Sequence, residues 1–162
     1  MLNEKMEKAL NEQINEELYS SYLYLAMAAW FESENLPGCA AWMQAQAREE
    51  NVHAMKFFKF INERRGRVTL KAIKEPVKQW KSPLAAFEAS LNHEQHITGC
   101  IDKLMNLAIA EKDYASVGLL QWFVNEQVEE EAHVDGIVQK LKMAEKAPGA
   151  LLMMDQALGE RK

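Results

Sequence analysis

Glu50 and His53 are the first residues of interest, because their types and spacing could bind a metal ion. On a helix, two residues three apart in the sequence lie on one face, one turn apart. A carboxylate and an imidazole placed in this way can reach the same cation and form half of a metal site. Two polar residues on a solvated helix surface have the same spacing. The pair alone is compatible with both a metal site and a solvated surface. Acidic residues at the same height on other helices would favour the metal site.

The chain around this pair predicts long helices, since only four prolines and seven glycines interrupt its 162 residues. Short turns join the first helix to the second and the third to the fourth, which predicts two antiparallel hairpins. A connection of about 17 residues between the hairpins could run the length of a bundle, at up to ~3.3 Å per residue. We expect one all-α domain over residues 1–162, a four-helix bundle with a short C-terminal fifth helix. The expected helices cover residues 4–33, 39–65, 83–111, 113–145 and 148–160.

Core-facing positions can be followed along each long helix at alternating steps of three and four residues. Each series is mostly apolar, yet each contains a glutamate near its middle: Glu17, Glu50, Glu94 and Glu130. An ionised carboxylate in a protein core costs several kcal/mol unless it is paired or bound to a metal. Four such residues, one on each helix, favour a metal site over chance.

The two predicted hairpins contain polar residues at the same spacing. Glu17 and Glu50 are 33 residues apart, Glu94 and Gln127 are also 33 residues apart, and the second pair follows the first by 77 residues. In both hairpins another polar residue comes three positions later. Because the members of each pair lie at comparable distances from their turn, we expect them at one height in the bundle. The site predicted from this spacing contains Glu17, Glu50, His53, Glu94 and Glu130, with Gln127 beside them.

Four carboxylates and one imidazole would form a hard, oxygen-rich site. Such a site suits iron or manganese, whereas the lack of thiolates and the single histidine argue against structural zinc. Carboxylates can bridge two ions, so we expect two metals with Glu50 between them. Glu17 and His53 would hold one ion, and Glu94 and Glu130 the other. Two ferrous ions in such a site could each give one electron to O₂.

Glu130 and His133 repeat the spacing of the first pair, which tempts one to add His133 to the site. The core-facing series argues against this. Glu130 and Val134 are four residues apart and lie on the same face of the helix, whereas His133 lies about 100° away from Val134 around the helix axis. We therefore expect His133 at a surface or an interface. The second ion would then lack a histidine ligand.

Other polar residues lie next to the predicted centre. Glu49, Glu126 and Glu129 are either solvated surface residues or a third, weaker cation site, and the sequence leaves both open. His93 and His96 flank Glu94 off its core-facing side, so we expect both on the surface.

The composition excludes several classes of partner. The net charge is −5 and no basic run could neutralise phosphates, so we expect no nucleic acid. No apolar run approaches the ~20 residues that span a bilayer, and the charged opening residues do not resemble a signal peptide. Cys39 and Cys100 are isolated and are expected to be reduced thiols. A soluble cytoplasmic protein is the expectation.

Four segments resemble the non-haem ferritins of bacteria and archaea, and the resemblance covers essentially the whole chain. They are NEELYSSYLYL, QAREENVHAMKFF, FEASLNHEQ and LLQWFVNEQVEEEAHV. The resemblance implies a ferritin-like four-helix bundle with a di-iron ferroxidase centre. The ligands implied for one iron are Glu17, Glu50 and His53, and those for the other are Glu50, Glu94 and Glu130, with Gln127 nearby.

The resemblance also implies roles for residues around the centre. Glu49, Glu126, Glu129 and Glu130 match a third iron site of the family. Tyr24 matches a tyrosine close to the centre that could donate an electron, although an ordinary core tyrosine would look the same.

The function implied by the resemblance is iron storage. Fe(II) would be oxidised by O₂ or H₂O₂ and stored as ferric oxyhydroxide in a cage of identical subunits, usually twenty-four. Haem is not expected, because the haem-containing relatives carry a methionine after the bridging glutamate, where this chain has Asn51. A non-mineralising di-iron oxidase or peroxidase of the rubrerythrin type is the alternative, although the chain lacks the Cys-x-x-Cys pairs of rubrerythrins. A metal-free interaction bundle is a third class, which the four core glutamates disfavour.

Overall fold

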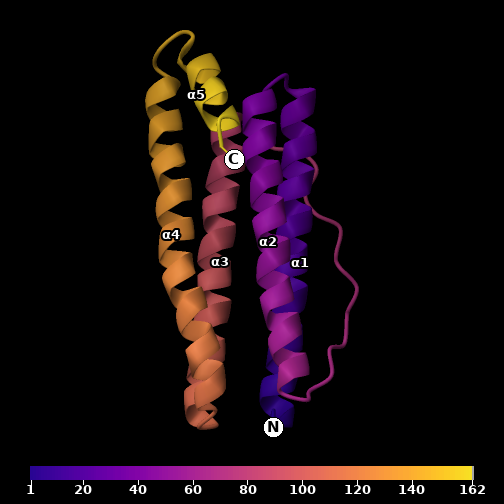
Figure 1. Ribbon diagram of the computed structural model, residues 1–162. Coiled ribbons are helices and arrows are strands. Elements are labelled where there is room, and N and C mark those ends of the chain that lie inside the picture. Colours follow the sequence, from indigo (N-terminus) through magenta and orange to yellow (C-terminus); the bar gives the residue numbers. More distant parts are fainter. Residues whose placement is uncertain (162) are drawn as a thin grey trace.

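The computed structural model of the protein describes residues 1–161, which contain five helices and no strand. Helices α1 and α2 form one antiparallel hairpin and α3 and α4 form the other, while α5 lies at one end of the bundle (Figure 1). None of the described helices is both long and apolar enough to cross a membrane. The prediction of an all-α bundle with a short fifth helix is confirmed. The helices are α1 Glu4–Ser33, α2 Pro37–Glu63, α3 Pro83–Ala110, α4 Tyr114–Ala144 and α5 Ala150–Gly159.

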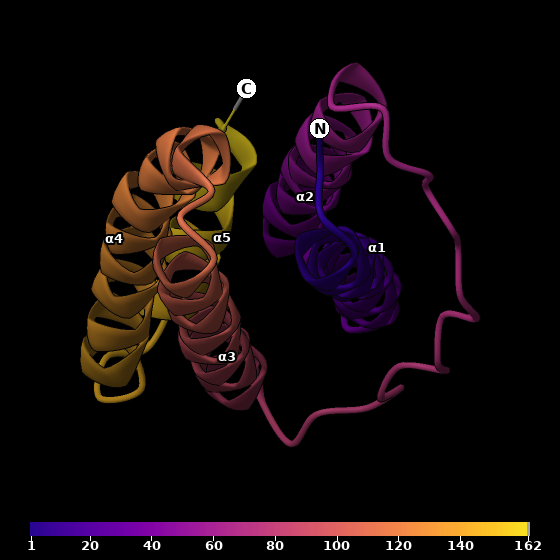
Figure 2. The same cartoon turned by 90° about the horizontal axis from the view of Figure 1, so that it is seen from below.

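The connection between the hairpins runs along the outside of α1 to the opposite end of the bundle (Figures 1 and 2). Asn11 of α1 holds it in place, because its Nδ2 donates to the carbonyl of Arg67 at 2.9 Å and its Oδ1 accepts from the amide of Thr69 at 2.7 Å. Asn15, one turn further along α1, donates to the carbonyl of Ala72 at 3.2 Å. The second hairpin therefore starts at the other end, and the middles of all four long helices meet.

Several helix ends differ from the expected positions. Helix α2 begins at Pro37, two residues early, because proline lacks an amide hydrogen and fits the first helical position. It ends at Glu63, two residues early, and Arg65 beyond it adopts the left-handed conformation with φ 58°. Helix α5 begins two residues late, because Gly149, with φ 79°, forms the turn before it. The remaining ends differ by at most one residue.

Helix α5 docks closely on the start of α2. A Cβ atom on Gly38 would lie 1.7 Å from the carbonyl oxygen of Asp155, so no larger residue fits there without moving α5. The side chain of Asp155 accepts a hydrogen bond from the amide of Cys39 at 2.7 Å. One of the free amides at the N-terminus of α2 is therefore satisfied by α5.

The apolar core is divided into two clusters. Phe31 and Phe87 belong to the cluster near α5, and Phe57 and Phe123, which stack with ring centroids 4.1 Å apart, belong to the other. Along each long helix, the residues of one cluster come before the mid-helix glutamate and those of the other come after it. The glutamates therefore lie in a layer between two apolar regions.

Candidate metal centre

Six polar side chains form a layer across the middle of the bundle, which we call the polar layer. They come from all four long helices, and none is more than 4% exposed. The structure brings together the six residues that the sequence places at the centre, while their binding of metal stays a prediction. The polar layer consists of Glu17 from α1, Glu50 and His53 from α2, Glu94 from α3, and Gln127 and Glu130 from α4.

One half of the polar layer is formed by Glu17, Glu50 and His53, whose donor atoms lie within 4.8 Å of one another. The Nδ1 atom of His53 is 3.0 Å from Oε2 of Glu50. Gln13 donates to Oε1 of Glu17 at 3.0 Å, but Oε2 of Glu17 is buried without a hydrogen-bond partner among residues 1–161. A buried acceptor without a partner is costly. A cation would satisfy it, so this half of the layer fits a metal ion.

The other half is organised around Glu94. Tyr24, which is fully buried, donates from its phenolic oxygen to Oε1 of Glu94 and lies 2.9 Å from the hydroxyl of Ser90. Gln127 donates to Oε2 of Glu94 at 3.2 Å. Both oxygens of this carboxylate therefore have a donor, and its position is fixed by α1 and α4.

Gln46 joins the two halves, although it was not among the residues predicted for the centre. Its Nε2 donates to Oε1 of Glu50 at 3.1 Å and to Oε2 of Glu130 at 2.8 Å. The sequence contained a signal for this contact, since Gln46 precedes Glu50 by one helical turn on the core-facing side. Glu130 also approaches His53, and these two form a group of possible ligands with Glu126 within 4.8 Å.

Burial shifts the pKa values of the acidic residues upward. Burial, followed by the charge of Glu50, raises the pKa of Glu17 and Glu94 well above the usual range. The same two causes raise the pKa of Glu130 to about 7. At neutral pH the polar layer without a cation therefore retains protons on Glu17 and Glu94. A divalent cation would displace them, because it satisfies the same oxygens.

Glu50 and His53 shift in opposite directions. Burial opposes the charge on Glu50, but the hydrogen bond and the charge of His53 outweigh it, so the pKa of Glu50 is lowered. Burial likewise opposes the charge on His53, yet its hydrogen bond to Glu50 and the nearby carboxylates raise its pKa. Glu50 is therefore the carboxylate of the layer that ionises most readily.

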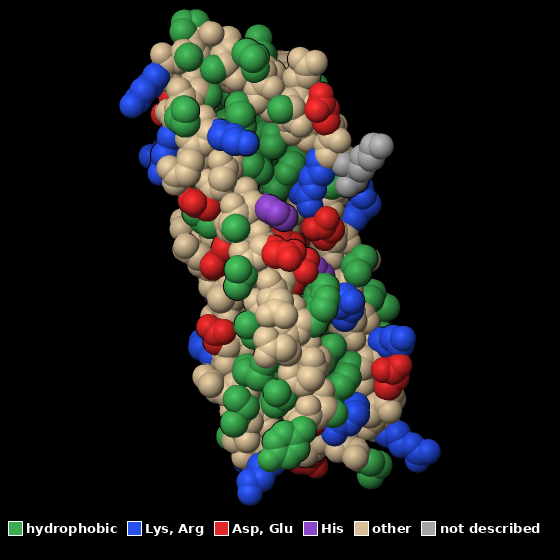
Figure 3. All heavy atoms as spheres, turned by 60° about the vertical axis from the view of Figure 1, so that its left-hand side comes forward, with side chains coloured by type: hydrophobic (Ala, Val, Ile, Leu, Met, Phe, Trp, Pro, Cys, Tyr) green, Lys and Arg blue, Asp and Glu red, His purple; other side chains and the backbone are tan. Residues whose placement is uncertain are grey.

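A cavity of about 390 Å³ adjoins the polar layer. Acidic side chains and a histidine gather at mid-height of this face (Figure 3). The guanidinium of Arg161 lies in the cavity wall, with Nη2 2.9 Å from Oε1 of Glu49 and 2.9 Å from Oε1 of Gln46. Arg161 therefore offsets part of the negative charge of the cavity, a role that no spacing in the sequence indicates. The cavity is lined by Trp42, Gln46, Glu49, Glu126, Glu129, Glu130, His133 and Arg161.

The histidines outside the polar layer differ in exposure. His133 and His96 are exposed, as expected. The expectation of a surface position is wrong for His93, which is partly buried because α1 packs over its ring. Its Nε2 lies 2.6 Å from the hydroxyl of Ser20, and Tyr19 contacts the ring edge-on. Burial lowers the pKa of His93 to about 4.

A ferritin-like domain matches residues 7–144 of the chain. The bacterial non-heme ferritin of Campylobacter jejuni is 42% identical to it, over 96% of this chain and 93% of that protein. The bacterial non-heme ferritin of Bacteroides fragilis is 42% identical, over 99% of this chain and 100% of that protein.

Among solved structures, an open-pore ferritin from Archaeoglobus fulgidus matches with a TM-score of 0.99 at 50% identity, and the match covers 100% of both chains. An engineered closed form of the ferritin from the same organism also matches with a TM-score of 0.99 at 50% identity, covering 100% of this chain and 99% of that one.

Proposed function

The chain belongs to the ferritin family, and we propose that it stores iron. It oxidises Fe(II) at the polar layer and keeps the Fe(III) as ferric oxyhydroxide inside a cage of its own copies. The polar layer is the observation that carries this proposal, since four carboxylates and one imidazole from four helices are buried at one level. This donor set is rich in oxygen and suits iron, which is here the substrate.

Each residue of the layer receives a role. Glu17 and His53 hold one iron, Glu94 and Glu130 hold the other, and Glu50 contacts both. Two contacts support the central role of Glu50, because one oxygen lies 3.0 Å from His53 and the other shares the amide of Gln46 with Glu130. Gln127 orients Glu94 through their hydrogen bond.

The reaction balances with two Fe(II) ions. Each gives up one electron, and the two electrons with two protons reduce O₂ to H₂O₂; H₂O₂ can also serve as the oxidant. The protein holds two cations side by side and excludes bulk water through the apolar clusters on both sides of the layer. Tyr24 is buried and donates a hydrogen bond to Glu94, so it orients this proposed iron ligand; the two electrons that reduce O₂ come from the two Fe(II) ions.

The cavity beside the layer would hold a third iron in passage. Glu49, Glu126 and Glu129 line it together with Glu130, which also belongs to the polar layer. A cation bound by these side chains would therefore share a ligand with the oxidation centre. Arg161 neutralises part of this charge and limits how firmly an ion is held.

Exposed apolar side chains support assembly into a cage. Large hydrophobic residues are about half exposed or more on all five helices, and those on α1, α2 and α5 come in pairs close together in the sequence, as a surface covered by neighbouring copies requires. We propose twenty-four identical subunits without haem, acting in the cytoplasm. The residues concerned are Tyr22 and Leu25 on α1, Val52 and Met55 on α2, and Leu152 and Met153 on α5.

Aerobic addition of a large excess of Fe(II) to the apo-protein tests this function. We expect far more oxidised iron to stay in solution with the protein than the polar layer can bind, in particles of constant outer size. Oxidation followed by precipitation would instead indicate a non-mineralising oxidase or peroxidase. The absence of accelerated oxidation would favour a metal-free bundle.

A further inference from the structure

A second group of possible metal ligands lies between α1 and α3, outside the polar layer. Its members are Glu16 from α1 and His96 and Cys100 from α3, and their donor atoms lie within 4.8 Å of one another. Nε2 of His96 is 3.0 Å from Oε2 of Glu16 and 3.6 Å from Sγ of Cys100. One nitrogen thus faces both an oxygen and a sulfur donor.

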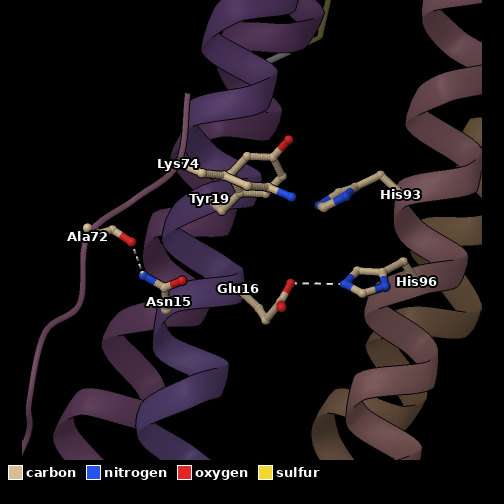
Figure 4. Close-up of a pocket in the computed structure, with 7 residues that line it drawn as sticks. All are labelled: Asn15, Glu16, Tyr19, Ala72, Lys74, His93 and His96. Atoms are coloured by element: carbon tan, nitrogen blue, oxygen red, sulfur yellow. Dashed lines mark hydrogen bonds and ion pairs between the residues drawn. The ribbon is translucent and has the colours of Figure 1, made fainter. Parts of the chain in front are cut away.

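The helical geometry explains this arrangement. His96 and Cys100 are four residues apart on α3, so their side chains lie on the same face, one turn apart. Glu16 comes directly before Glu17 on α1, and its side chain therefore points about 100° away from the polar layer. Figure 4 shows Glu16 and His96 pointing toward one another from the two helices.

The space around the group is open. Glu16 and His96 line a cavity of about 390 Å³ together with Tyr19 and His93, and the side chain of His96 is 56% exposed. An ion could therefore enter from solvent and keep a water molecule in a remaining coordination position. His93 is not part of this group of ligands, and its Nε2 lies 2.6 Å from the hydroxyl of Ser20.

The donor set differs chemically from that of the polar layer. One carboxylate oxygen, one imidazole nitrogen and one thiolate sulfur are the three ligand types found around Zn²⁺, at about 2.0–2.3 Å from the ion. Thiolate disfavours Mg²⁺, Ca²⁺ and Mn²⁺, which prefer oxygen. The observed separations of 3.0 and 3.6 Å are close to those between neighbouring ligands of a small tetrahedral ion.

We propose that Glu16, His96 and Cys100 form a second metal site, which binds a thiophilic divalent transition ion of the Zn²⁺ type with water completing its coordination. The S–H proton of Cys100 leaves to solvent as the sulfur–metal bond forms. Glu16 belongs to the first hairpin and the other two ligands to the second, so the bound ion links the hairpins. The site is independent of the proposed iron chemistry.

Anaerobic titration with Co²⁺ tests the site directly, because cobalt bound to a thiolate absorbs in the near ultraviolet through charge transfer. The polar layer contains no sulfur, so this absorption reports only on a cysteine. The apo-protein, kept reduced with a phosphine, should develop the band and saturate at about one sulfur-bound ion per chain. Cys100→Ser should abolish the band, and His96→Gln should weaken the binding at least about tenfold.

Cys39→Ala is the matched control, since Cys39 is the other thiol of the chain and is buried beside Asp155. This variant should keep the full cobalt band. The proposal is wrong if the unaltered protein shows no band, or if Cys100→Ser retains it. Circular dichroism on each variant confirms that the helices are intact. Zn²⁺ should also raise the thermal midpoint more in the unaltered protein than in Cys100→Ser.

Discussion

Tyr24 donates a hydrogen bond from its phenolic oxygen to Oε1 of Glu94 inside the bundle, where neither side chain is more than 1% exposed. Burial, followed by the charge of Glu94, raises the pKa of Tyr24 well above its usual value. The phenol therefore stays protonated at neutral pH and remains a donor. The hydrogen bond fixes one oxygen of a proposed iron ligand.

Replacing Tyr24 by phenylalanine keeps the ring and removes this donor. We expect Fe(II) oxidation to slow by about tenfold or more, because a hydrogen bond to a charged group contributes about 1.5 kcal/mol or more. Stopped-flow absorbance of the ferric product measures the rate. Tyr22→Phe is the control, since Tyr22 is 49% exposed on the same helix. Equal rates in both variants would remove Tyr24 from the mechanism.

The stability of the apo-protein should depend on Glu130. Burial and then Glu50 raise its pKa from 4.5 to about 7, with Glu49 adding to the shift and Gln46 and His53 opposing it. A raised pKa means that the folded state binds the proton more tightly. The stabilisation is therefore complete below about pH 4.5 and is lost as the pH rises through 7.

Thermal midpoints of the apo-protein with chelator, measured between pH 4.5 and 8, check this dependence. We expect the midpoint to fall with rising pH, and to fall less in Glu130→Gln, which cannot ionise. An identical slope in the variant would show that Glu130 titrates normally.

Arg161 should weaken cation binding in the cavity beside the polar layer. Replacing it by glutamine removes the positive charge 2.9 Å from Glu49, so the affinity for a cation should rise several-fold. Tb³⁺ luminescence, sensitised by Trp42 in the cavity wall, measures this affinity. Lys142→Gln removes an equal charge elsewhere on the surface and should leave the affinity unchanged. A weaker affinity in Arg161→Gln would mean that the arginine positions the carboxylates.

Gly38→Ala should loosen the docking of α5. The added Cβ would lie 1.7 Å from the carbonyl oxygen of Asp155, and relieving this overlap costs about 1–3 kcal/mol. The thermal midpoint should fall by roughly 2–4 °C for each kcal/mol. Gly118→Ala is the control, because nothing lies within 4 Å of its added Cβ and alanine favours the helix by about 1 kcal/mol. A midpoint equal to that of the control would disprove tight docking.

The fold could be predicted because its signals are local. Runs without proline or glycine mark the helices, and steps of three and four residues mark the faces that are buried. The same periodicity placed a glutamate near the middle of each core-facing series, and the equal 33-residue spacings placed Glu17 level with Glu50 and Glu94 level with Gln127. The comparisons confirm the resemblance to non-haem ferritins.

Contacts between distant segments could not be predicted in this way. Arg161 reaches Gln46 across 115 residues, and Asp155 reaches Cys39 across 116, so no local spacing reports either contact. His93 lies off the core-facing side of its helix, yet α1 covers its ring. Such contacts depend on how the helices are rotated and where the chain end returns.

Rapid mixing of two Fe(II) per chain with O₂, in the unaltered protein and in Glu50→Ala and His53→Ala, tests the central claim most directly. Both variants should oxidise iron more than about tenfold more slowly, because even the partners of metal ligands contribute ~10–100-fold. Helix content by circular dichroism should be unchanged, and His133→Ala should react nearly as fast as the unaltered protein. Fast oxidation that survives the loss of Glu50 and of His53 would contradict an oxidation centre in the polar layer.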